Sequence, residues 1–87
     1  MLICNSNKIL KLDNLPSTLQ ELYCVENQIK SLDNLPLCLI LLNCKNNQIE
    51  YLDWIPANLI ILDCSSNPIK NLSNLPNSLK FLSSCGN

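Results

Sequence analysis

Six cysteines are the residues of this 87-residue chain best suited to chemistry. A thiol can form a disulfide, bind a metal or act as a nucleophile. A zinc site would need Cys-x-x-Cys pairs or histidine partners, and the sequence has neither. A nucleophile at Cys38 or Cys85 would have only lysine to activate it, and no Gly-rich phosphate loop is present. We therefore expect no metal, no cofactor and no enzymatic activity.

The other four cysteines are separated by intervals of 20 residues, which favours a structural role. Inward-pointing residues on adjacent parallel strands would stack about 4.8 Å apart, and side chains arranged in this way usually miss the dihedral angle of a disulfide. We interpret them as reduced, buried, small hydrophobic residues, whereas Cys38 and Cys85 are the more reactive thiols. The stacked set comprises Cys4, Cys24, Cys44 and Cys64.

The 20-residue interval extends over the whole chain. Its unit reads Leu-x-x-Leu-x-Cys-x-x-Asn-x-Ile-x-x-Leu-x-x-Leu-Pro-x-x and runs through four copies without an insertion. A period of this length is typical of stacked coils that bury one apolar edge against their neighbours. We assign residues 1–87 to a single domain, with units at about 2–21, 22–41, 42–61 and 62–81 and a partial unit at 82–87.

These units resemble the leucine-rich-repeat signature, with cysteine where many members carry a third leucine. The clearest segments are Leu19 to Ile29, Leu39 to Ile49 and Leu59 to Ile69. The Leu-Pro dipeptides and the short period are most similar to the 20-residue subclass of secreted bacterial effectors, and related repeats occur in amoebal and giant-virus proteins. The resemblance implies a solenoid of the α/β horseshoe class that serves as a binding scaffold, without indicating for what.

The alternation of apolar and polar residues predicts five short strands in one parallel sheet, at residues 1–5, 21–25, 41–45, 61–65 and 81–85. The proline in each unit is unfavourable for an α-helix. We therefore expect extended, polyproline-like and 3₁₀ segments on the other side of a β-rich, right-handed coil.

Two sets of asparagines are predicted to shape the coils, because the only glycine is Gly86. Both sets suit positive φ angles. The first should also form a ladder that satisfies backbone groups where each strand ends, so that Asn47→Ala destabilises the fold while Asn46→Ala is nearly silent. The first set is Asn7, Asn27, Asn47 and Asn67, and the second is Asn14, Asn34 and Asn74.

An apolar strip is predicted on the exposed face of the sheet. Leu41, Ile61 and Phe81 occupy one outward row, with Tyr23 beside it in the next. An exposed apolar strip usually marks an interface, although strand propensity alone also favours such residues. These four residues are our first candidate protein-binding site.

Tyr51 and Trp54 form a second candidate site on the outer side of the third unit. Trp54 replaces the asparagine of the second set, and aromatic residues dominate interaction hot spots. The alternative is that the two rings pack on each other and on Leu37. In the same turns, Asp13, Asp33 and Asp53 are expected to cap their own backbone rather than to hold a metal.

Composition narrows the classes of partner. Six lysines, no arginine and a net charge of −1 give no basic footprint for nucleic acid, and no apolar run is long enough to span a membrane. The first residues turn polar too soon for a secretory signal, so a cytoplasmic location is expected, including a host cytosol for an effector or viral protein. The favoured function is protein–protein interaction through the sheet face. The alternative is self-association through uncapped ends or through the sheet face.

Overall fold

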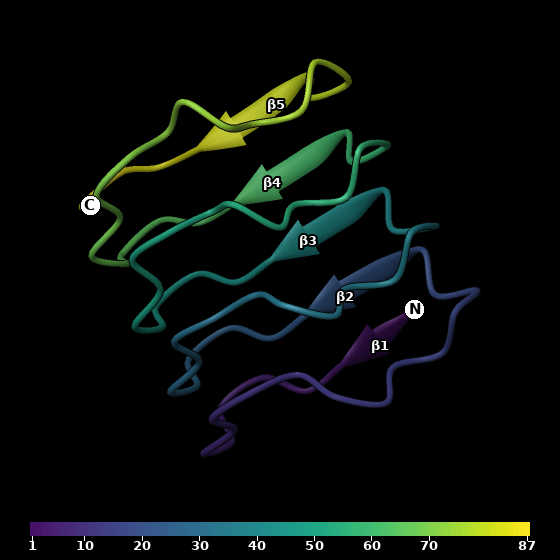
Figure 1. Cartoon of the computed structure of the whole chain (residues 1–87). Coiled ribbons are helices and arrows are strands. Elements are labelled where there is room, and N and C mark those ends of the chain that lie inside the picture. The colour runs from purple at the N-terminus through teal and green to yellow at the C-terminus, as the bar shows by residue number, and fades with distance from the viewer.

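Five short strands, one in each coil, lie side by side in a computed structural model that describes residues 1–87 (Figure 1). All pair in parallel with their neighbours in sequence order, as predicted. The first strand has two residues and each of the others has three. The strands are β1 (Leu2–Ile3), β2 (Glu21–Tyr23), β3 (Leu41–Asn43), β4 (Ile61–Asp63) and β5 (Phe81–Ser83).

The register of the sheet follows the repeat. Leu42 of β3 pairs with Leu22 on one side and with Leu62 on the other, so equivalent residues always lie opposite each other. The strands end about two residues earlier than the sequence predicted, although backbone bonding between coils continues past them. The N–H of Cys24, for example, donates to the carbonyl of Asn43 at 2.8 Å.

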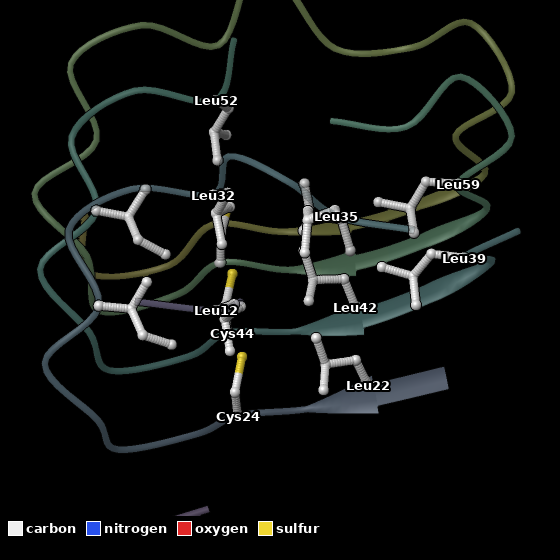
Figure 2. Close-up of a cluster of buried hydrophobic side chains, with 14 of the residues drawn as sticks. Leu12, Leu22, Cys24, Leu32, Leu35, Leu39, Leu42, Cys44, Leu52 and Leu59 are labelled. Carbon is white, nitrogen blue, oxygen red and sulfur yellow. The ribbon is translucent and has the colours of Figure 1, made fainter. Parts of the chain in front are cut away.

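The core is a single apolar layer between the sheet and the opposite segments. Leu22, Leu42 and Leu62 are almost completely buried, and Cys24, Cys44 and Cys64 are fully buried beside them. Figure 2 shows Cys24 and Cys44 with leucines from the sheet and from the segments opposite. Burying a leucine side chain contributes about 1.5–3 kcal/mol relative to exposure. The column of repeated residues is therefore what holds each coil against the next.

Isolated turns and extended segments, rather than 3₁₀ helices, complete each coil. The carbonyl of Pro36 accepts a hydrogen bond from the N–H of Leu39 at 3.2 Å, and the prolines of the other units form the same turn. Each such turn has one bond and is followed directly by an extended segment, so no 3₁₀ helix develops. None of the elements is a helix that would be long and apolar enough to cross a membrane.

The predicted asparagine ladder is present. Asn47 donates from Nδ2 to the carbonyls of Cys24 and Cys44 at 3.0 and 2.9 Å, and its Oδ1 accepts the N–H of Ile29 at 3.0 Å. Asn27 and Asn67 repeat this pattern one coil away on either side. No buried side-chain polar atom lacks a hydrogen-bond partner. Asn47 thus satisfies two cysteine carbonyls and one isoleucine N–H to which the backbone bonding between coils gives no partner.

Positive φ angles fall in a different column from the one predicted for the ladder. Asn14 and Asn34 have φ of 57° and 59°, as expected of the second asparagine set, whereas the third member, Asn74, does not have a positive φ. The ladder asparagines do not, and the residues directly before them carry the positive φ instead. This corrects the expectation for Asn46, because an alanine at its φ of 60° would be strained. The column is Ser6, Glu26, Asn46, Ser66 and Gly86.

Candidate functional site

The apolar strip on the sheet consists of Leu41, Ile61 and Phe81. They are direct neighbours in the register of β3, β4 and β5, so the structure brings these three predicted residues together. Leu41 is half-buried, Ile61 is 38% exposed and Phe81 is 64% exposed. Exposure therefore increases along the strip toward the last strand.

Tyr23 lies on the same face but outside this strip. It pairs with Ile3 on one side and Asn43 on the other, one outward row away from Leu41. Ile3 is exposed, while Tyr23 is half-buried. The structure thus places Tyr23 in a smaller apolar pair with Ile3 of the first strand, a residue that was not among the predicted site residues.

Tyr51 and Trp54 lie in the segment that follows Ile49, far along the coil from the strands. Trp54 is 69% exposed, and Tyr51 and Leu37 are also exposed, so the three residues do not bury one another. Tyr51 and Trp54 both line one open pocket on this outer side. They form a surface separate from the strip.

One ion pair lies next to Tyr51. The Lys70 Nζ lies 3.0 Å from Glu50 Oε1 and 6.0 Å from the centre of the Tyr51 ring. The hydrogen bond that Lys70 donates to Glu50, together with the negative charge of Glu50, raises the pKa of the exposed Lys70. Lys70 therefore remains a cation that is already engaged by Glu50.

The aspartates of the outer turns bond across coils, which corrects their predicted role. Asp13 Oδ1 accepts from Asn34 Nδ2 at 3.4 Å, and Asp53 Oδ1 accepts from Asn74 Nδ2 at 3.0 Å. Neither carboxylate caps its own backbone. No group of three or more possible ligand residues lies close enough to hold a metal ion. These contacts could not be predicted from one unit, because they join residues 21 positions apart.

The cysteine column is buried and its thiols are free. Cys24, Cys44 and Cys64 are fully buried and Cys4 partly so, whereas Cys38 and Cys85 are exposed. Burial raises the pKa of the Cys24 thiol to about 12, with a further contribution from Cys4, and it raises the pKa of Cys44 well above its ordinary value. A protonated, inaccessible thiol is a poor nucleophile. The column therefore packs the core.

Alkaline pH is expected to destabilise the fold through Cys24. Between pH 9.0 and about 12 the unfolded chain loses this proton while the folded chain keeps it. The stabilisation is complete below pH 9.0 and decreases by about 1.4 kcal/mol per pH unit above it. Urea unfolding between pH 8 and 10 should show a shallower decline for Cys24→Ala than for the exposed-site control Cys38→Ala. Identical declines in the two variants would contradict this account.

The C-terminal end of the stack exposes core positions. Leu72 and Leu82 are 41% and 44% exposed, although their counterparts Leu52 and Leu62 are buried. No further coil in the structure covers them (Figure 1).

The stacked 20-residue coils, the in-register parallel sheet and the asparagine ladder define a leucine-rich-repeat protein, as the repeat predicted. Among solved structures, the chain is similar to YopM from Yersinia enterocolitica WA-314. That likeness has a TM-score of 0.82 and 38% sequence identity, and it covers 91% of this chain. The chain spans 18% of the length of the YopM chain. A scan against protein-family models and a search of curated proteins give no match.

Proposed function

We propose that this chain is a non-catalytic module that binds a protein partner through the exposed face of its sheet. The observation that carries the proposal is the strip of Leu41, Ile61 and Phe81, which lie in register on three adjacent strands. Nothing in the fold requires apolar side chains at these outward positions. Contiguous exposed apolar residues mark interaction surfaces, and solenoids present such surfaces as extended binding faces.

The expected result of Ile61→Asp is loss of partner binding with the fold intact. Ile61 points away from the core while its neighbour Leu62 is 1% exposed, so the charge disrupts the surface and leaves the packing unchanged. The matched control is Leu37→Asp, the same kind of change at a side chain that is 78% exposed and lies off the sheet. The measurement is circular dichroism followed by quantitative affinity capture from the native cell with parent and variants.

Two outcomes would contradict the proposal. If Ile61→Asp unfolds the protein, the outward assignment of the strip is wrong. If Ile61→Asp and Leu37→Asp retain the same partners as the parent, the strip reflects strand propensity alone.

Self-association is the second candidate function, because the exposed strip of Leu41, Ile61 and Phe81 could also be covered by a second copy of the chain. Light scattering across a concentration series distinguishes the candidates, because a chain that remains monomeric cannot act by self-association. An Ile61→Asp change should reduce association if the strip is responsible.

A cytosolic location is part of the same proposal. It is supported by the six free thiols, since exposed Cys38 and Cys85 would be prone to oxidation in an oxidising compartment. If the chain acts inside a host, the corresponding compartment is the host cytosol.

A further inference from the structure

The Asp–Asn hydrogen bonds on the outer side repeat from coil to coil, except at Asp33. In each pair, the aspartate accepts a hydrogen bond from the asparagine 21 residues later: Asp13 from Asn34, and Asp53 from Asn74. The same offset from Asp33 leads to Trp54. Trp54 thus occupies the place of the amide that would have bonded Asp33.

As a result, Asp33 is left without a partner. Its carboxylate makes no hydrogen bond to a side chain or backbone group and no ion pair, since the two ion pairs of the chain are Lys11–Asp13 and Lys70–Glu50. The indole has a single N–H donor, and it makes no hydrogen bond to Asp33. The position that holds an amide in the neighbouring units thus holds an aromatic ring, which lines the same pockets as the free carboxylate.

Asp33 and Trp54 together line two adjoining open pockets. Asn34 and Leu35 complete the first pocket, and the second extends past Ser31 toward Tyr51. Trp54 is 69% exposed, so the ring is accessible to a ligand that enters either pocket. The two pockets therefore share one carboxylate and one aromatic surface.

The charges around these pockets favour a cation. Asp33 and Asp53 face the second pocket together with one lysine, Lys30, which makes no ion pair. The Lys70 and Glu50 charges nearby neutralise each other. The remaining charge at the pocket is thus one net negative, and the free carboxylate is the one beside the indole.

We propose that Asp33 and Trp54 bind an arginine side chain of a partner protein, at a site separate from the sheet face. A guanidinium is planar, so it can stack on the indole while its N–H groups donate to the carboxylate. A lysine ammonium would gain the charge contact but not the stacking, so it should bind more weakly. This site does not depend on the apolar strip, so an experiment can contradict one of the two proposed binding surfaces without affecting the other.

The test uses the fluorescence of Trp54, the only tryptophan of the chain. The probes are the peptide acetyl-Gly-Arg-Gly-amide and its citrulline analogue, which is nearly isosteric with arginine but uncharged. Titration with the arginine peptide should change the indole emission saturably, while the citrulline peptide leaves it unchanged. Asp33→Asn should weaken binding by about tenfold, the loss expected for a hydrogen bond to a charged group. Asp13→Asn, which alters an aspartate outside these two pockets, is the control and should retain full binding.

Trp54→Asn provides a second test, because it restores an amide donor at the position where the other coils have one. The variant should remain folded, with a melting temperature equal to or above that of the parent, and should lose the arginine-induced shifts of the Asp33 and Leu35 amide resonances in NMR spectra. Equal responses to the arginine and citrulline peptides would overturn the proposal. An arginine affinity in Asp33→Asn equal to that of the parent would also overturn the proposal. This second result decides the question even if Trp54→Asn fails to fold.

Discussion

Replacing Leu62 with alanine is expected to lower the free energy of unfolding by about 2–5 kcal/mol. Leu62 is 1% exposed and lies on β4, where it pairs in register with Leu42 and Leu82. The spacing of the coils is set by backbone bonds on both sides of this strand, so the core cannot collapse to fill the lost volume. A natural domain has only about 5–15 kcal/mol of stability in total, and the variant would lose a large part of it.

The measurement is urea unfolding of Leu62→Ala beside Leu37→Ala. Leu37 has the same side chain at 78% exposure, so its removal should change the stability by no more than about 0.5 kcal/mol. Similar midpoints for the two variants would show that Leu62 is not a core residue.

Replacing Asn47 with alanine is expected to lower the free energy of unfolding by about 2–4 kcal/mol. The amide holds the carbonyls of Cys24 and Cys44 and the N–H of Ile29, and the three contacts are buried. Each buried backbone group left without a partner costs about 1–3 kcal/mol, and the penalties do not add fully because the groups share one site. The loss should appear as a lower midpoint in urea unfolding.

The control for this change is Asn74→Ala, which removes one exposed hydrogen bond to Asp53 and should shift the stability by no more than about 0.5 kcal/mol. Asn46 cannot serve as the control because of its positive φ. If Asn47→Ala and Asn74→Ala unfold at the same urea concentration, the ladder does not stabilise the fold.

The fold could be predicted from the sequence because every inward position repeats by type. Leu22, Leu42 and Leu62 recur at the same place in units without insertions, so one unit determines the strand, the register and the buried column of the next. The ladder was predictable for the same reason, since an asparagine after each strand has one backbone environment to satisfy.

The positive-φ column could not be predicted in this way. Its members include Ser6, Glu26 and Gly86, which share no side-chain chemistry, because the constraint acts on the backbone and the side chains point to solvent. The asparagines beside them were an equally plausible choice from the sequence alone.

The candidate sites were only partly predictable. Leu41, Ile61 and Phe81 could be selected because apolar types stood out in an outward row. The missing partner of Asp33 could not, because that contact links neighbouring coils and becomes visible only when Asp13 and Asp53 are seen to bond their asparagines.

Nearest-neighbour pairing of the strands also has a consequence for how the chain folds. Each strand pairs only with the strand 20 residues before or after it, so no contact in the sheet requires the two ends of the chain to meet. The conformational entropy lost in closing one coil is therefore the same at every step. No step requires the closure of a long loop between distant parts of the chain. Folding can begin at any pair of neighbouring coils and then propagate in both directions, one coil at a time.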